Sequence, residues 1–386
     1  MANINRREFI MTSAAAALAP SGFAAEGAVF DLNGRGRPLS QFIWGALLHL
    51  GCNMWDDFEN DPDGWARSAA EEKKRPNPFG PSGKRRSRYH SYLFCEDDVW
   101  RRTSDAAHAA GCNMLLVDVG EAVVYPSHPE LAVAGSWSVE KLRRELARLR
   151  ALGLEPIPKL NFSATHDAWL KNYHRMLSTP IYYQVVADVI RDTVEIFDHP
   201  RFFHIGYDEE HARDQQNHFH VTARQSDLWW HDLNYTIGQV EKNGVQAMMW
   251  ADAIWYNRAN YLKRMSKGVI QQNWYYRADF SPEALRWKPE FEKTHEGWPE
   301  KIHGAAAFLE LQKAGFRQIP CASNYFEEEA TDALVRFCRE RMDPSLMLGI
   351  CTAPWAASVR DGGGMKGEEH TLRGLEQFAA AKRRYF

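Results

Sequence analysis

The chain has 386 residues, of which 45% are hydrophobic and 25% are charged, so it is long enough to bury a large core. Its formal net charge of -3 and its pI of about 6.6 do not favour nucleic acid or an anionic membrane surface as a partner. Aromatic residues make up 12% of the chain, including 14 Trp. Clustered Trp side chains serve either as core bulk or as platforms on which sugar rings stack.

The N-terminus has the pattern of an export signal. Paired Arg6 and Arg7 precede an apolar, Ala-rich run over residues 11–20, and small residues follow. This order is typical of a cleaved signal peptide, and the paired arginines resemble the twin-arginine type. The apolar run is too short to anchor the chain in a bilayer. We therefore predict a signal peptide at residues 1–25, a single mature domain at 26–386, and a bacterial periplasmic or secreted location.

Export makes disulfide bonds chemically accessible to the six cysteines. Cys52 and Cys95 flank a long irregular segment, so a bridge between them would close that segment into a loop. Substrates of the twin-arginine pathway are exported in a folded state, so disulfides are not obligatory. We expect buried free thiols, with a bridge between Cys52 and Cys95 as the alternative.

Eight short apolar runs recur along the chain, and most are followed by an amphipathic helical pattern. The runs cover residues 42–48, 114–119, 155–161, 202–206, 247–252, 269–274, 318–323 and 347–352. They are nearly continuous rather than alternating, which is typical of parallel strands that are covered on both faces. The predicted helices run over residues 97–110, 138–152, 180–198, 227–243, 328–342 and 371–384, and several end at a Gly or before a Pro.

This alternation predicts an α/β fold, a (β/α)8 TIM barrel. A doubly wound sheet would need a Gly-rich phosphate-binding loop after the first strand, and residues 50–55 lack that pattern. The segment at about 53–93 is rich in Pro and carries two basic clusters, so we predict a long loop there. Such loops are either solvated connections or functional elements, for example a lid over the barrel mouth.

Three consecutive carboxylates, Asp208, Glu209 and Glu210, follow the fourth predicted strand. Like charges a few ångströms apart raise one another's pKa, so this crowding is costly unless the residues face a wet pocket. Glycoside hydrolysis uses such an arrangement, with one carboxyl protonated as the general acid and a second charge near the developing oxocarbenium ion. The alternative is a helix N-terminus, where acidic residues interact favourably with the helix dipole.

The other predicted strand ends also carry polar groups, and several add a Trp. In a barrel these ends meet at one face, which is where active sites form. Carboxylates and amides bind sugar hydroxyls, and indole faces stack on the sugar ring. The residues that we predict to bind substrate are His49, Asp118, Asn161, His204, Trp250, Asp252, Asn273, Trp274, Tyr325 and Trp355.

Residues 204–209, His-Ile-Gly-Tyr-Asp-Glu, resemble the His-x-Gly-Gly-Asp-Glu signature of family 20 glycoside hydrolases, the β-N-acetylhexosaminidases. The resemblance implies that Glu209 is the general acid/base. It also implies that Asp208 orients and polarises the 2-acetamido group of the substrate, which serves as the internal nucleophile. Tyr275 or Tyr325 would be a second contact to the acetamido oxygen. We predict that no cofactor or metal is needed.

Two positions differ from the family pattern. Tyr207 replaces the second Gly of the signature, and His49 stands at the end of the first strand, where the family usually has an Arg that binds sugar hydroxyls. These differences bear on the substrate more than on the chemistry. We therefore predict an exported glycoside hydrolase that acts on a β-linked sugar, with or without an N-acetyl group.

Three other functions remain as alternatives. One is a two-carboxylate glycosidase. A retaining enzyme of this kind needs a Glu at the end of the seventh strand, where this chain has Ser-Asn-Tyr at residues 323–325. An inverting enzyme could pair Glu209 with Asp118 or Asp252. A metal-dependent hydrolase is suggested by several His residues after the fourth strand, but His49 lacks the His-x-His context common in such barrels. A non-catalytic glycan-binding barrel is the third alternative.

Overall fold

The computed structural model describes residues 41–56, 89–215, 218, 220–292, 299–362 and 365–386. The predicted signal peptide at 1–25 lies outside the described residues, and so do residues 57–88 of the predicted long loop. Within the described part of the chain, no helix combines the length and the apolar character that a membrane crossing requires.

The described sheet consists of parallel strands, and each of them overlaps one of the eight predicted apolar runs; only His49 of β1 and Gln246 of β5 lie one residue outside their runs. They are β1 (Ile43–His49), β2 (Met114–Asp118), β3 (Glu155–Lys159), β4 (Phe202–His204), β5 (Gln246–Trp250), β6 (Ile270–Gln272), β7 (Cys321–Ala322) and β8 (Gly349–Thr352). Their order is β6-β5-β4-β3-β2-β1-β8-β7. Bridges from Gln271 to Gln318 and from Trp274 to Cys321 join the two remaining edges. The sheet is therefore closed, and the prediction of a (β/α)8 barrel is confirmed.

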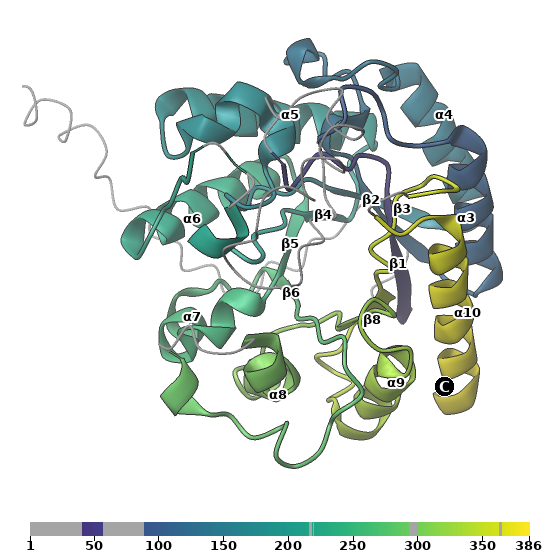
Figure 1. The fold of residues 1–386 in the computed structure, drawn as a ribbon. Coiled ribbons are helices and arrows are strands. Elements are labelled where there is room, and N and C mark those ends of the chain that lie inside the picture. Colours follow the sequence, from purple (N-terminus) through teal and green to yellow (C-terminus); the bar gives the residue numbers. More distant parts are fainter. Residues whose placement is uncertain (1–40, 57–88, 216–217, 219, 293–298, 363–364) are drawn as a thin grey trace, which may run out of the picture. The chain divides into compact units, whose positions relative to one another are not determined.

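An α-helix follows each strand and lies on the outside of the barrel (Figure 1). The helices are α3 (Asp97–Ala109), α4 (Val139–Ala151), α5 (Pro180–Ile196), α6 (Asp227–Lys242), α7 (Arg258–Arg264), α8 (Ala305–Lys313), α9 (Ala330–Arg341) and α10 (Glu368–Tyr385). All six predicted helices are present, with ends that differ by three residues or fewer. Helices α7 and α8 were not predicted, because α7 has seven residues and α8 begins with three alanines that give no periodic pattern.

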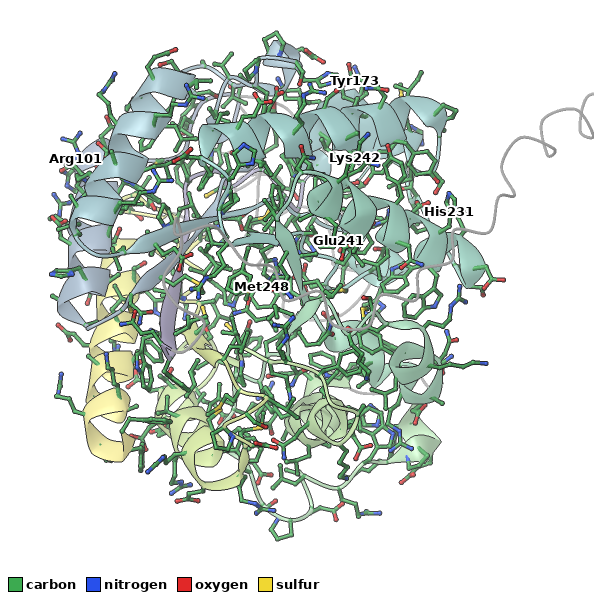
Figure 2. The ribbon with its side chains drawn as sticks, turned by 180° about the vertical axis from the view of Figure 1, so that it is seen from behind. Arg101, Tyr173, His231, Glu241, Lys242 and Met248 are labelled. Carbon is green, nitrogen blue, oxygen red and sulfur yellow. The ribbon has the colours of Figure 1, made fainter. Side chains whose placement is uncertain are left out.

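The strands are covered on both faces, as their continuous apolar sequences predicted. Every residue of β1 and of β2 is buried. Figure 2 shows the resulting division: Met248 of β5 lies in the interior, whereas Arg101 of α3 and Lys242 of α6 lie on the outer surface. The six cysteines are free thiols, so Cys52 and Cys95 are not bridged in this structure.

The last residues of four neighbouring strands are in register across the sheet. His49 pairs with Asp118, Asp118 with Lys159, and Lys159 with His204. All four are buried. This row of polar residues marks the carboxyl end of the barrel, and the loops above it carry the candidate site.

Candidate active site

A pocket of about 250 Å³ opens at the carboxyl end of the barrel, where the strands run into the loops that follow them. Predicted residues that line it are Asn161, Asp208, Glu209, Trp274, Tyr325 and Trp355. Further lining residues, which the sequence analysis did not select, are Met54, Trp55, Lys159, His166, Tyr276, Glu300, Phe326, Met365 and Lys366. The pocket thus draws on the segments after six strands, β1, β3, β4, β6, β7 and β8.

The chain turns sharply after β4, and three residues of this turn have a left-handed backbone. Their φ angles are +74° at Gly206, +69° at Tyr207 and +52° at Glu209. Only glycine fits at the first position, because a Cβ atom there would lie 2.0 Å from Oδ1 of Asn161. Strained non-glycine residues cost about 1–3 kcal/mol each and cluster at functional sites. The turn therefore places Asp208 and Glu209 at the expense of stability.

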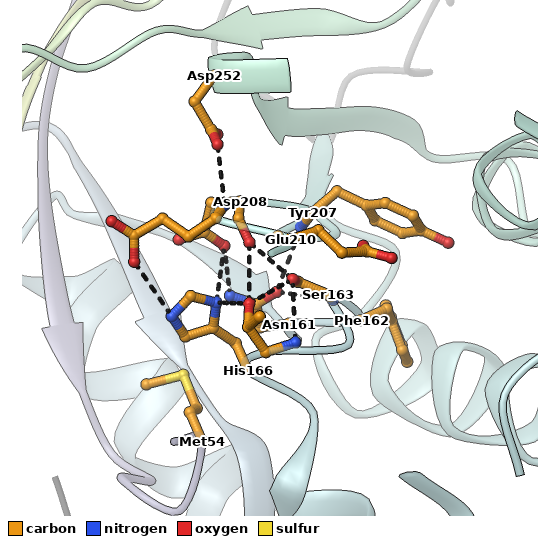
Figure 3. Close-up of polar contacts among 12 residues, drawn as sticks. Met54, Asn161, Phe162, Ser163, His166, Tyr207, Asp208, Glu210 and Asp252 are labelled. Atoms are coloured by element: carbon orange, nitrogen blue, oxygen red, sulfur yellow. Dashed lines mark hydrogen bonds and ion pairs between the residues drawn. The ribbon is translucent and has the colours of Figure 1, made fainter. Parts of the chain in front are cut away.

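Asp208 is held by the loop that follows β3 (Figure 3). Nδ2 of Asn161 donates to Oδ1 of Asp208 over 2.7 Å, and the hydroxyl of Ser163 donates to the backbone carbonyl of Asp208 over 2.6 Å. Oδ1 of Asn161 accepts from the backbone N–H of Tyr207 at 3.2 Å. Asp208 is 7% exposed and lines the pocket. One carboxylate oxygen is thus fixed by Asn161, and this orients the other.

Glu209 projects further into solvent, with 42% of its side chain exposed. His166 lies between the two acids: its Nε2 is 3.6 Å from Oε2 of Glu209, and its Nδ1 is 3.6 Å from Oδ1 of Asp208. The hydroxyl of Thr165 is 2.9 Å from the same Nδ1, and the imidazole side chain is 4% exposed. His166 was not among the residues predicted from the sequence. The only available signal was its position in the loop that begins at Asn161.

Asp252 supports Glu209 from behind. Its Oδ2 accepts the backbone N–H of Glu209 at 2.8 Å, and its side chain is buried without lining the pocket. Burial, and next the negative charge of Asp208, raise the pKa of Asp252 to about 8. Asp252 therefore favours its protonated form far more than an exposed carboxyl does.

Replacing Asp252 with Asn should flatten the dependence of stability on pH. The raised pKa means that the folded protein holds a proton that the unfolded chain releases, so stability is lost as pH rises from about 4 through about 8. The free energy of unfolding of the wild type should fall over this range more steeply than that of the variant. Urea unfolding at about pH 5 and about pH 9 measures both slopes. Equal slopes would mean that Asp252 titrates alike in both states.

Four predicted binding residues form the floor beneath the pocket and do not line it. Asp118 accepts from the Lys159 ammonium at 2.5 Å and lies 3.2 Å from Nδ1 of His49. Burial alone would raise the pKa of Asp118, but these two partners lower it to about 2. The rings of His204 and Trp250 lie below with their centroids 4.6 Å apart and their planes inclined by 58°, and burial lowers the pKa of His204 well below its usual range.

Aromatic rings form much of the pocket wall. Trp274 and Tyr276 are stacked with centroids 4.9 Å apart and an interplanar angle of 24°. The ring centroid of Trp355 lies 5.7 Å from that of Trp250 below it and 6.4 Å from that of Tyr276 beside it. The surfaces that these rings present suit the apolar face of a sugar.

Two predicted residues after β6 serve the scaffold instead of the pocket. Tyr275 is buried, does not line the pocket, and has its ring 5.3 Å from that of Phe280, so Tyr276 occupies the place expected for it. Asn273 donates to the carbonyl of Gly304 at 2.8 Å and accepts from the indole of Trp255 at 3.1 Å. Its amide therefore ties the end of β6 to neighbouring segments.

His166, Asp208 and Glu209 are the one group of potential metal ligands found among the described residues. One candidate ligand atom from each lies within 4.8 Å of the others. Each ring nitrogen of His166 faces a different carboxylate, so the imidazole can bridge the two acids without an ion. The donor set fits a divalent ion as well, with two carboxylates and one imidazole.

The sequence matches no protein-family profile and no curated protein. Its structure is similar to solved structures. The family 20 β-N-acetylhexosaminidase of Streptomyces coelicolor superposes with a TM-score of 0.54 at 11% identity, covering 87% of this chain and 63% of that chain. The β-N-acetylhexosaminidase of Bacteroides fragilis superposes with a TM-score of 0.53 at 12% identity, covering 87% of this chain and 65% of that chain. Dispersin B superposes with a TM-score of 0.50 at 15% identity, covering 74% of this chain and 95% of that chain.

This chain spans less than two thirds of the length of the first two proteins. At such low identities the similarity establishes the fold alone. The chain is therefore a (β/α)8 barrel similar in fold to the family 20 β-N-acetylhexosaminidases.

Proposed function

We propose that the protein is a glycoside hydrolase that cleaves a β-linked, N-acetylated sugar by substrate-assisted catalysis. One observation carries the proposal: the adjacent acids Asp208 and Glu209 are held at the end of β4 in a pocket with aromatic walls. The known activity of the structurally similar hexosaminidases supports the same chemistry.

Each acid has the exposure that its proposed role requires. Glu209, the more exposed, protonates the leaving oxygen and then removes a proton from the attacking water. Asp208, fixed through Oδ1 by Asn161, presents its other oxygen to the N–H of the acetamido group. The acetamido oxygen attacks the anomeric carbon as the bond from that carbon to the protonated leaving oxygen breaks. The water activated by Glu209 then adds to the anomeric carbon and releases the acetamido group. His166 lies within 3.6 Å of a carboxylate oxygen of each acid.

Among the residues that the structure describes, the other carboxylates near the pocket are poorly placed as a nucleophile or second base. Asp118 is bound by Lys159, and Asp252 lies behind Glu209; neither lines the pocket. Glu300 does line it, but is 3% exposed and accepts from the backbone of Tyr276 at 2.9 Å and from Arg277 at 3.2 Å. This distribution favours an internal nucleophile from the substrate over a two-carboxylate mechanism.

A panel of 4-nitrophenyl glycosides tests the proposal. We expect turnover of the N-acetyl-β-glucosaminide or N-acetyl-β-galactosaminide and little turnover of the β-glucoside, because the latter lacks the internal nucleophile. Release of 4-nitrophenolate measures the rates. If the protein hydrolysed only sugars without an acetamido group, it would still be a glycosidase, but the substrate-assisted mechanism would be rejected.

Metal dependence is the second candidate mechanism, favoured by the grouping of His166, Asp208 and Glu209. Dialysis of the enzyme against EDTA distinguishes the substrate-assisted mechanism from the metal-dependent one. Substrate-assisted hydrolysis should survive dialysis unchanged, whereas activity that is lost and then restored by Zn²⁺ would support a metal-dependent reaction.

We also propose that the protein acts after export, in the periplasm or outside the cell, since residues 1–25 carry a twin-arginine-like pattern. Fractionation of cells that express the full chain tests this, with Arg6→Lys/Arg7→Lys as the export-defective control. Cytoplasmic retention of the unaltered chain would reject it.

A further inference from the structure

Arg224 is a buried cation next to the catalytic motif, and the proposed mechanism does not use it. Its side chain is 0% exposed. Nε donates to Oε1 of Glu210 at 2.7 Å, and Nη2 donates to Oε2 at 3.1 Å, which makes a two-pronged ion pair. Glu210 directly follows Glu209, so this ion pair anchors the chain one residue beyond the acid/base.

The same guanidinium reaches two further segments and a second residue of the turn after β4. Nη2 also donates to the backbone carbonyl of Phe162 at 2.5 Å, and Nη1 donates to Oδ2 of Asp232 in α6 at 3.2 Å. Its central carbon lies 4.7 Å from the ring centroid of Tyr207. Tyr207 directly precedes Asp208, so Arg224 contacts the residues on both sides of the acid pair.

We propose that Arg224 is a positioning residue for Asp208 and Glu209. It fixes the two residues that flank the acid pair. Through Phe162 it also fixes the loop in which Asn161 contacts Asp208 and His166 contacts both acids. The inference rests on the proposed function, because it assigns Arg224 a part in that reaction.

The strained backbone gives the physical reason why this position needs a guanidinium. Tyr207 and Glu209 both have left-handed φ angles, and a side chain at Tyr207 makes that conformation costlier than a glycine would. The Tyr207 ring is held by Arg224 on one side, by Trp229 at 5.9 Å, and by a 3.0 Å hydrogen bond to Thr236. If this packing loosens, the strained peptides can rotate and carry the carboxylates with them.

Lysine cannot replace this arginine. A lysine ammonium keeps the charge but lacks the planar fork that contacts both oxygens of Glu210 while also reaching Phe162 and Asp232. Arg224→Lys therefore avoids leaving Glu210 as an uncompensated buried charge and tests geometry specifically.

The chain offers a closely matched control. Arg201 is also buried, donates to both oxygens of Glu155 at 3.1 and 2.5 Å, and lies 4.7 Å from the Phe202 ring. It precedes β4, and Glu155 begins β3, so this pair sits at the opposite end of the barrel from the pocket. Arg201→Lys thus makes the same chemical change away from the acids.

The experiment compares both variants with wild type on the best substrate of the glycoside panel, well below every unfolding midpoint. We expect kcat to fall about 100-fold in Arg224→Lys with KM changed only a few-fold, since misplacing a catalytic group by about 1 Å has that effect. Arg201→Lys should keep wild-type kcat even if it lowers Tm. A wild-type kcat in Arg224→Lys, or equal losses in both variants, would overturn the positioning role.

A structural readout keeps the test independent of activity. Crystal structures of wild type and Arg224→Lys should differ in the distance between the Glu209 carboxylate and His166, with the α6 backbone unchanged. Acids in identical positions would overturn the inference. Wild-type inactivity on every glycoside would instead count against the proposed function.

Discussion

Glu209→Gln should reduce kcat by about 10²–10⁴-fold on N-acetyl-β-glycosides, with KM changed only a few-fold. The amide matches the carboxyl in size but cannot release a proton to the leaving oxygen. Its contacts should survive, because the backbone N–H of residue 209 still donates to Asp252 and the side chain still reaches His166. Steady-state kinetics on the glycoside panel measure the change.

Leaving groups of different basicity provide an internal control for Glu209→Gln. A 4-nitrophenolate leaves with little protonation, whereas an alkyl alcohol or a second sugar needs the acid in full. The variant should therefore lose more activity on the alkyl glycoside than on the aryl glycoside. Equal losses on both would mean that Glu209 acts by another route, such as ground-state binding.

The fold was predictable because each strand is covered on both faces. Such strands have continuous apolar sequences, and β2, from Met114 to Asp118, is buried at every residue. Helix α4 carries its own start signal, since the Ser138 side chain accepts from the N–H of Lys141. Helix α8 lacks such signals, and its burial against the barrel is decided by tertiary packing.

The site was predictable only in part, because a strand end does not reveal which residue beyond it faces inward. After β6 the sequence offers adjacent Tyr275 and Tyr276, and the local turn directs the second toward the pocket. At β2 and β3, Asp118 could be read as a free carboxylate, yet Lys159 on the neighbouring strand binds it. Pairings between strands require the register, which a single sequence does not supply.

Loop residues were harder still. His166 contacts both acids, but its position depends on the path of the loop after β3, which no periodic pattern encodes. Arg224 lies 14 residues beyond Glu210 in sequence and folds back against it. Its role could not be inferred from spacing, because a lone arginine in a loop is usually solvated.

Asp208→Asn should abolish most turnover of acetamido sugars, with a loss of about 10²–10³-fold in kcat. Nδ2 of Asn161 donates to Oδ1 of Asp208, so an asparagine at 208 will present its own carbonyl oxygen to Asn161. Its NH2 group then takes the place of Oδ2. The substrate N–H would meet a donor instead of an acceptor, and the charge that polarises the acetamido group would be gone.

Fluorination of the N-acyl group provides the mechanistic readout for this variant. Replacing acetyl with trifluoroacetyl weakens the acyl oxygen as a nucleophile, so the wild-type rate should drop steeply if that oxygen attacks the anomeric carbon. In Asp208→Asn the acetamido and trifluoroacetamido substrates should both be slow. A wild-type rate that is insensitive to fluorination would show that the acetamido oxygen is not the nucleophile. Asp208 would then be a residue that binds the N-acyl group, and a protein nucleophile would have to be sought among the pocket residues, starting with Glu300.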